Sequence, residues 1–428
     1  MKIELKDGRF LTDNSQECCE GCFFVVTKPN EKFAAAAVQK GAKLLTAREA
    51  IELLGLQSGL KLIGVTGTNG KTTTAQAIAF GLNALGVKCG VSGTCGAWVA
   101  GKKVAPKGLT TSQFLETLSY LKSAKEVGCE AFVAEVSSHA IELGRIEGLQ
   151  WFLKIFTNLT QDHLDFHKTF EAYAAAKSRF FEDEGLKLLN KDALDALSFN
   201  GVGASFYSLK EECEFYAKEA KFVPNIAAKV VCGGEECEFE SPLVGEFNLY
   251  NLLAAFGAIK LVSGKNSALI AAALSGFAGV AGRVEVVSSE PLVVVDFAHT
   301  PDGIEKVLGA FKGRELVVVF GAGGNRDKSK RPKMGAAVER FAKIAIVTSD
   351  NPRDEDPREI IAQVCGGMRH ALVEVDRKRA IERAIALATN GESVVILGKG
   401  DEDYQEVKGV KQHFSDKEVV QEILAARK

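Results

Sequence analysis

Residues 61–74 read K-L-I-G-V-T-G-T-N-G-K-T-T-T, and this stretch decides the fold around it. It opens with an apolar, β-branched run at 61–65, passes through two glycines and enters a helical pattern that extends over 74–85. A strand that leads through glycines into a helix turns backbone N–H groups and the positive helix N-terminus toward one point. The stretch therefore predicts a phosphate-binding loop between a buried strand and a helix.

The side chains of this loop suit a nucleoside triphosphate. Lys71 can reach the β- and γ-phosphates, and the Thr72 hydroxyl can bind Mg²⁺. The spacing departs from the common G-x-x-x-x-G-K-[ST] pattern, because position 65 is valine and Gly67 lies only three residues before Gly70. We expect consecutive residues to form the cradle, namely Gly67, Thr68, Asn69, Gly70, Lys71, Thr72 and Thr73.

Strand and helix patterns alternate on both sides of the loop. Further buried strands are expected at 131–134, 152–156 and 186–189, with a helix at 170–181. A β-rich insert at about 202–244 precedes a long helix at 251–262. Such alternation predicts a mostly parallel sheet with helices on both faces.

The pattern restarts near residue 282 with five apolar strand runs, at 292–295, 316–320, 344–347, 372–375 and 393–397. Polar residues and glycines follow most of these strands, where an open α/β sheet binds its ligands. We predict an α/β protein of three domains. They are a small N-terminal α/β unit at 1–58, a central P-loop domain at 59–281 and a C-terminal Rossmann-like open sheet at 282–428.

Composition narrows the function. The 428 residues carry 53 basic and 55 acidic side chains, a balance that argues against a general nucleic-acid binder. No apolar run approaches the ~18 residues of a membrane span. The N-terminus lacks a signal sequence, so we expect a cytoplasmic protein whose ten cysteines are free thiols.

Two further segments carry residue types that bind metals. Glu135 follows the strand at 131–134 in E-V-S-S-H, where a carboxylate can hold Mg²⁺. The next strand leads into T-N-L-T-Q-D-H-L-D-F-H at 157–167, with two histidines and two aspartates within six residues. On residue types alone, this second cluster is equally a metal site or a polar loop.

Taken in order, these motifs resemble the Mur ligase family, the ATP-dependent amide-forming enzymes of peptidoglycan synthesis. The resemblance also rests on A-A-K at 175–177, G-E-F-N-L-Y-N at 245–251, Gly282-Arg283, D-F-A-H-T-P-D at 296–302 and G-A-G-G-N-R-D at 321–327. It covers the chain beyond residue 60. It implies that ATP phosphorylates the D-Glu side-chain carboxylate of a UDP-muramyl dipeptide, and that an amine then attacks the acyl phosphate.

The resemblance also implies roles for individual residues. The implied catalytic residues are Lys71, Glu135, His163 and Lys177. Thr72, Glu135, His163 and Lys177 would hold Mg²⁺, with Lys177 as a carbamate (N6-carboxylysine), although its spacing alone indicates a solvated helix lysine. The implied nucleotide contacts are Asn248, Asn251, Arg283 and Asp296. The implied contacts to the UDP-muramyl peptide are Thr110, Thr111, Ser137 and Arg145.

The segment D-N-P-R at 350–353 resembles the signature of family members that add meso-diaminopimelate. This amino acid carries a far carboxylate that lysine lacks, and the Arg353 fork can pair with it bidentately. A polar site rejects an analogue without the matching group by ~10⁴-fold or more. The expected amino-acid pocket comprises Arg326, Asp350, Asn351, Arg353, Gly398 and Glu402, with Glu402 taking an ammonium.

Two departures and three alternatives stay open. Asp401 stands where relatives often have histidine in G-K-G-H-E, and the short N-terminal unit has Asp13-Asn14-Ser15 in place of a D-S-R element. UDP binding is expected in that unit without assigned residues. The alternatives are a lysine-adding ligase, a folylpolyglutamate synthetase-like ligase and a non-catalytic nucleotide-binding regulator. We expect a monomer.

Overall fold

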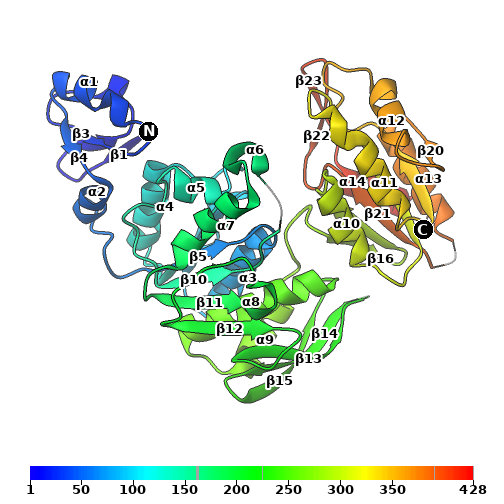
Figure 1. Ribbon diagram of the computed structural model, residues 1–428, viewed down its shortest axis with the longest axis horizontal. Coiled ribbons are helices and arrows are strands. Elements are labelled where there is room, and N and C mark those ends of the chain that lie inside the picture. The colour runs from blue at the N-terminus through cyan, green and yellow to red at the C-terminus, as the bar shows by residue number, and fades with distance from the viewer. Residues whose placement is uncertain (161–162, 224, 390, 428) are drawn as a thin grey trace. The chain divides into compact units, whose positions relative to one another are not determined.

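The computed structural model describes residues 1–160, 163–223, 225–389 and 391–427. The chain divides into two compact units (Figure 1). Unit 1 comprises Met1–Ala220, Ala227–Ser241 and Phe247–Phe277, and unit 2 comprises Lys221–Ile226, Pro242–Glu246 and Ala278–Lys428.

Unit 1 is built around a sheet that has eleven strands in the described part of the chain, in the order β15-β14-β13-β12-β11-β10-β5-β9-β6-β7-β8. The four predicted strands are present as β5 (Lys61–Thr66), β9 (Ala131–Glu135), β10 (Leu153–Phe156) and β11 (Leu186–Asn190). The β-rich insert forms four more strands, β12 (Ala204–Ser208), β13 (Phe215–Lys221), β14 (Ile226–Cys232) and β15 (Glu235–Ser241). From β12 to β6 (Cys89–Gly93), neighbouring strands run parallel, as predicted. An unpredicted antiparallel extension follows, β7 (Gly96–Val99) and β8 (Lys102–Ala105).

Leu62 and Gly64 of β5 are two residues apart, so they lie on the same face of the sheet. Leu62 shares a core with Leu118 and Leu121 of α4 (Phe114–Glu126), and a Cβ on Gly64 would lie 2.6 Å from Phe180. On the opposite face, α3 (Lys71–Ala84) packs closely on α8 (Glu246–Ser263) and α9 (Ser267–Ser275), because Gly81 carries no side chain. Figure 1 shows α4, α5 (Ser138–Glu142) and α7 (Phe170–Ser178) on one side of the strands and α8 and α9 on the other. The phosphate loop therefore emerges at the carboxyl edge of a sheet covered on both faces.

The N-terminal segment forms its own small sheet, β1 (Lys2–Glu4), β2 (Phe10–Thr12), β3 (Phe23–Val25) and β4 (Lys43–Leu45), with α1 (Ala34–Gln39) and α2 (Ala47–Leu53). Ile3, Leu11 and Val25 share one apolar core with Leu62 and Phe132 of the central sheet. This segment is thus part of unit 1. The predicted domain boundaries after residues 58 and 281 stay predictions.

Unit 2 holds a second open sheet, for which the described residues give the strand order β16-β17-β21-β18-β19-β20. All pairs are parallel except β16 with β17. The strands are β16 (Glu285–Ser289), β17 (Leu292–Asp296), β18 (Leu316–Phe320), β19 (Ile344–Val347), β20 (Leu372–Val373) and β21 (Ser393–Leu397). The carboxyl ends of β17, β21, β18 and β19 therefore meet at one edge.

Two helix layers cover this sheet. On one side, α11 (Arg331–Glu339) packs between α10 (Pro301–Gly309) and α12 (Pro357–Cys365). On the other side, α13 (Arg377–Leu387) and α14 (Asp416–Ala425) share a core with the strand valines. A hairpin of β22 (Tyr404–Val407) and β23 (Val410–His413) lies beside the carboxyl edge.

Two predictions from composition can be compared with the structure. None of the helices in the described ranges is long and apolar enough to cross a membrane. The ten cysteines are free thiols, as predicted.

Candidate active site

The phosphate loop requires glycine at two positions. Gly67 has a φ of 151° and Gly70 a φ of 85°, backbone conformations that favour glycine. A Cβ on Gly67 would lie 1.9 Å from Thr157 Oγ1, and one on Gly70 would lie 2.2 Å from Asn251 Oδ1. The loop thus fits closely between the end of β10 and helix α8, with Gly70 as the N-cap of α3.

Neighbouring side chains hold this loop in shape. The Lys71 ammonium folds back over it and donates to the carbonyls of Gly67 at 2.9 Å and Thr68 at 2.8 Å. Asn69 N donates to Asn158 Oδ1 at 3.0 Å, and Thr157 Oγ1 donates to Asn69 O at 2.6 Å. The first two residues of the 157–167 motif therefore support the phosphate loop, a role that the sequence analysis did not assign.

Thr72 and Glu135 converge, as expected for a shared cation. Thr72 Oγ1 lies 2.9 Å from Glu135 Oε2, and the carboxylate is 2% exposed. Thr94 N donates to Glu135 Oε1 at 3.0 Å, and Thr94 Oγ1 lies 3.4 Å from Oε2. Thr94, which sequence reasoning missed, follows β6, so its position could be inferred only from the strand order. A hydroxyl beside a carboxylate is an oxygen pair that suits Mg²⁺.

Lys177 is buried, so the solvated helix lysine indicated by spacing alone is wrong. Its side chain is 1% exposed, and its ammonium donates to Gly67 O at 3.0 Å. It also lies 4.9 Å from the centre of the Tyr173 ring, whose hydroxyl is 3.0 Å from Thr68 Oγ1. The structure thus brings Lys177 to the phosphate loop through α7.

His163 lies in an aromatic cluster near the same tyrosine. Its ring centroid is 6.1 Å from that of Tyr173 and 4.9 Å from that of His139. His167 is buried, 2.9 Å from Ser138 Oγ, and burial lowers the pKa of its imidazole. Gln161 and Asp162 of the motif lie outside the described residues. Within the described residues, no group of three or more His, Cys, Asp or Glu side chains is arranged to hold a metal ion.

The four residues expected to hold the UDP-muramyl peptide gather around Glu135. Thr111 Oγ1 donates to Glu135 O at 2.9 Å and accepts from Ser137 N at 2.9 Å. Thr110 Oγ1 lies 3.1 Å from Thr94 Oγ1, and Arg145 Nη1 donates to Thr111 O at 3.1 Å. Among the described residues, the buried Arg145 Nε has no hydrogen-bond partner, and burial lowers the pKa of this guanidinium. An unsatisfied buried donor of this kind suits an anionic ligand.

The expected nucleotide contacts divide between the units. In unit 1, Asn251 Nδ2 donates to Asn248 Oδ1 at 3.2 Å, and Asn251 packs against Gly70 of the loop. In unit 2, the Arg283 guanidinium lies 5.0 Å from the centre of the Phe297 ring. The Asp296 carboxylate accepts from Val284 N at 2.7 Å and Ala298 N at 2.6 Å, and burial raises its pKa.

Unit 2 carries a pocket of about 170 Å³ at the carboxyl ends of its strands. All six residues expected to bind the amino acid line it: Arg326, Asp350, Asn351, Arg353, Gly398 and Glu402. Guanidinium and carboxylate groups thus face one small cavity. A zwitterion needs partners of both signs, so the lining suits a free amino acid.

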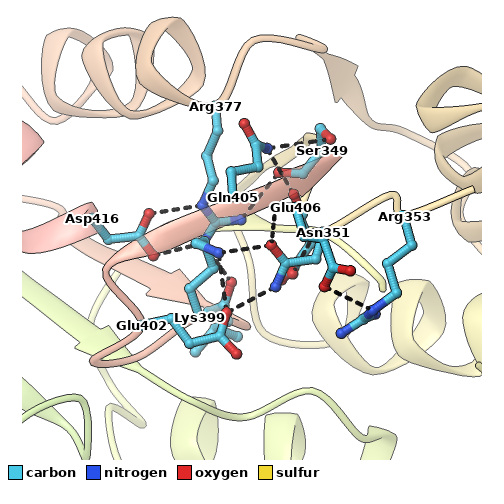
Figure 2. Close-up of polar contacts among 11 residues, drawn as sticks. Ser349, Asn351, Arg353, Arg377, Lys399, Glu402, Gln405, Glu406 and Asp416 are labelled. Atoms are coloured by element: carbon cyan, nitrogen blue, oxygen red, sulfur yellow. Dashed lines mark hydrogen bonds and ion pairs between the residues drawn. The ribbon is translucent and has the colours of Figure 1, made fainter. Parts of the chain in front are cut away.

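The hairpin β22–β23 holds the Arg353 loop in place (Figure 2). Arg353 N donates to Glu406 O at 3.1 Å, and its Nε lies 3.4 Å from Glu406 Oε2. Arg353 Nη1 donates to Gly324 O at 2.9 Å. With a φ of 51°, Arg353 takes a left-handed conformation that is uncommon for a non-glycine residue. These contacts fix the direction of the guanidinium before any ligand binds.

Comparison with known proteins gives two family matches and several closely similar relatives. The Mur ligase middle domain matches residues 65–259, and the Mur ligase, glutamate ligase domain matches residues 282–400. The chain is 45% identical over 414 residues to the UDP-N-acetylmuramoyl-L-alanyl-D-glutamate--2,6-diaminopimelate ligase of Wolinella succinogenes, which covers 96% of this chain and 95% of the relative. It is 43% identical over 427 residues to the Helicobacter pylori ligase of the same name, with 96% and 95% covered.

Solved structures resemble the whole chain. A UDP-N-acetylmuramoyl-L-alanyl-D-glutamate--2,6-diaminopimelate ligase superimposes with a TM-score of 0.74 at 30% identity, covering 97% of this chain and 94% of that one. A Mycobacterium tuberculosis folylpolyglutamate synthase reaches 0.64 at 19% identity, with 82% and 92% covered, which shows a shared fold alone. On the two family matches and the near-complete coverage of its relatives, the chain belongs to the Mur ligase family of ATP-dependent amide ligases.

Proposed function

We propose that this protein adds meso-2,6-diaminopimelate to the D-Glu side-chain carboxylate of UDP-N-acetylmuramoyl-L-Ala-D-Glu, with ATP as the energy source. The observation that carries the proposal is the small pocket in unit 2, which is lined by all six expected residues, two of them basic and two acidic. It occurs in a chain that is 45% identical to a relative named for the same reaction.

The phosphoryl-transfer half of the reaction is assigned to unit 1. The glycine turn and Lys71 would receive the β- and γ-phosphates, since the ammonium already lies over the loop carbonyls. The Thr72 hydroxyl and Glu135 carboxylate, 2.9 Å apart, would hold Mg²⁺, which neutralises charge on the transferring phosphoryl group when bound. The D-Glu carboxylate oxygen attacks the γ-phosphorus, and ADP leaves.

The amide-forming half needs an amine held beside the acyl phosphate. The amine nitrogen attacks the acyl carbon, the C–O bond to phosphate breaks, and the nitrogen loses a proton as the amide forms. In this proposal, Thr110, Thr111, Ser137 and Arg145 hold the muramyl peptide, and the buried Arg145 Nε supplies an N–H to an anionic group. Residues 1–58 would bind UDP, residues 59–281 would bind ATP and residues 282–428 would bind the amino acid.

The proposal extends to a carbamate on Lys177. Carbon dioxide would add to the neutral amine, an N–C bond would form and a proton would leave, which turns a cation into an anionic oxygen ligand. The position supports this role, because Lys177 is buried against the phosphate loop on the side of His163. His163 would then help to hold a second cation. We further infer that the protein acts as a monomer in the cytoplasm.

The experiment is phosphate release with ATP, Mg²⁺ and the UDP-muramyl dipeptide, comparing diaminopimelate, lysine and ornithine. Turnover with diaminopimelate alone is expected, because lysine lacks the far carboxylate that Arg353 is proposed to bind. Turnover with lysine would instead support a lysine-adding ligase. Turnover with folate and glutamate, and none with the dipeptide, would overturn the proposal in favour of a folylpolyglutamate synthetase. Binding of ATP without turnover of any substrate would support a nucleotide-binding regulator.

The variant Arg353→Ala further distinguishes a diaminopimelate-adding ligase from a lysine-adding one. Loss of a bidentate charged pair should raise KM for diaminopimelate about 100-fold while KM for ATP stays unchanged. An unchanged KM for diaminopimelate would refute the assignment of Arg353.

A further inference from the structure

Lys399 is a buried cation that the reaction described above does not use. It follows β21 in the segment G-K-G-D-E, and its side chain has no exposed surface. Its ammonium lies 3.0 Å from Glu402 Oε2 and 3.2 Å from Asn351 Oδ1 (Figure 2). A buried charge is costly unless it is paired and hydrogen-bonded. Lys399 satisfies that condition with two residues of the amino-acid pocket.

The contacts of Asn351 decide which end of its amide faces which partner. Its Oδ1 accepts from Lys399 Nζ and from Glu406 N, the latter at 2.9 Å. Its Nδ2 donates to Glu402 Oε2 at 2.9 Å. A flipped amide would point N–H groups at two donors, so Lys399 and the hairpin together hold the amide in one orientation.

Glu402 is fixed by the same contacts. Among the described residues, Lys399 and Asn351 donate hydrogen bonds to the Glu402 carboxylate, and both bonds go to Oε2. The Glu402 side chain is 23% exposed and lines the pocket. A carboxylate accepts several hydrogen bonds, so Oε1 can still receive one from a ligand ammonium.

Lys399 itself does not belong to the pocket lining, whereas Asn351 and Glu402 do. The fully buried ion pair of Arg377 and Asp416 supports the segments on either side of the pocket. Arg377 donates to Leu397 O at 3.0 Å and to Ser349 O at 3.4 Å. These carbonyls lie two residues before Lys399 and two before Asn351, so one guanidinium holds both segments.

We propose that Lys399 is a positioning residue for the amino-acid substrate, which acts through Asn351 and Glu402 without touching the ligand. It sets the polarity of the pocket, with an N–H of Asn351 for a substrate carboxylate and an oxygen of Glu402 for a substrate ammonium. The inference rests on the proposed binding of a zwitterionic amino acid in this pocket. It predicts that Lys399 controls the amino-acid KM and leaves phosphoryl transfer alone.

The test is a double-mutant cycle with Lys399→Met and Glu402→Gln in the full-length enzyme. Each variant is assayed for phosphate release with varied diaminopimelate, ATP and UDP-muramyl dipeptide. Loss of a charged hydrogen-bond partner should raise KM for diaminopimelate in Lys399→Met about tenfold to a hundredfold. The value of kcat and both other KM values should stay within about threefold, since unit 1 is unaltered. Lys378→Met is the control, because Lys378 pairs with Glu422 on the exposed surface of the same unit.

The cycle distinguishes positioning from a general effect on folding. If Lys399 acts through Glu402, adding Lys399→Met to Glu402→Gln should raise KM for diaminopimelate by a smaller factor than adding it to the native enzyme. We expect at most about a third of the native factor. An unchanged KM in Lys399→Met would overturn the proposal, as would the full factor in both backgrounds or an equal loss for all three substrates.

Removing one member of a buried pair can unfold a protein, whereas removing both charges leaves none unpaired. If Lys399→Met does not fold, the double variant is compared with Glu402→Gln. A further rise in KM of no more than about thirtyfold, a third of the largest factor expected for Lys399→Met, then supports the proposal, and a larger rise contradicts it. If the native enzyme uses lysine instead of diaminopimelate, the proposed substrate is wrong, and the same comparison made with lysine still tests Lys399.

Discussion

Replacing Gly93 with alanine would place a methyl group where the Glu135 carboxylate lies. A Cβ at Gly93 would be 1.9 Å from Glu135 Oε1 and 2.5 Å from the carboxyl carbon. Gly93 ends β6, next to β9, which carries Glu135. Its φ is not in the left-handed region, so the substitution tests space alone.

The expected loss of catalytic rate in Gly93→Ala follows from how far the Glu135 carboxylate must move. Non-bonded carbon and oxygen atoms need more than 3 Å, so Oε1 has to retreat by roughly 1 Å or more. Glu135 is 2% exposed and is held by Thr72 Oγ1 and Thr94 N, so this movement breaks its contacts with the cation site. Misplacement of a reacting group by about 1 Å costs about 100-fold in rate, or about 2.7 kcal/mol of transition-state stabilisation.

The assay is ADP release at saturating dipeptide and diaminopimelate, with Mg²⁺ titrated. We expect kcat/KM in Gly93→Ala to fall about 100-fold and the half-saturating Mg²⁺ concentration to rise. Gly201→Ala is the matched control, because a Cβ there meets nothing within 4 Å. Native kinetics in Gly93→Ala would refute the reasoning that Glu135 must occupy its present position.

Three further predictions follow from buried charges. Lys177→Ala should abolish ADP release and leave ATP binding within a few-fold, and the native enzyme alone should incorporate labelled carbon dioxide; retained turnover would exclude the carbamate role. Burial lowers the pKa of His167 below its usual 6.5, so the unfolded chain takes up a proton that the folded chain refuses. The free energy of unfolding of the native protein should therefore fall from pH 7 to pH 5.5 more steeply than that of His167→Gln. Urea unfolding, followed by the fluorescence of Trp98 and Trp151 in unit 1, measures both. Equal pH dependences would contradict this prediction. Arg377→Met leaves Asp416 buried and unpaired, which should destabilise unit 2 by about 3–5 kcal/mol in calorimetry, whereas adding Asp416→Leu should restore most of that loss; a stable single variant would be the contrary result.

Strand positions were predictable where burial dominates the sequence. The runs that became β9, β17 and β18 are continuous apolar stretches, which is the pattern of strands covered on both faces. The strands β6 to β8 went unpredicted because Cys89–Gly93 and Gly96–Val99 contain glycine, serine and cysteine, whose strand preference is weak. β6 forms by pairing with β9, and β7 and β8 extend the sheet from β6; the pairing of β6 with β9 is a long-range contact that local patterns do not reveal.

The six residues that line the pocket of unit 2 could be named from the sequence, but the contacts that support them could not. Arg353 and Glu402 could be named because D-N-P-R and G-K-G-D-E, in the loops after β19 and β21, resemble family motifs. Thr94 and Glu406 do not stand out, since a single threonine or an acidic residue in a charged hairpin is common on any surface. Their positions follow from the strand order in one case and from the packing of β22 against the Arg353 loop in the other.

The burial of Lys177 is predictable from helical periodicity. Tyr173, Lys177 and Phe180 are spaced four and three residues apart, which is the spacing of one helix face, and all three are buried. A lysine that shares the apolar face of a short helix is therefore predicted to be buried. The flanking Ala174 and Ala176 are small enough to let the helix pack closely, so the ammonium reaches the carbonyl of Gly67. The Gly67 carbonyl and the face of the Tyr173 ring compensate the burial of this cation, so α7 holds a charged group at the phosphate loop.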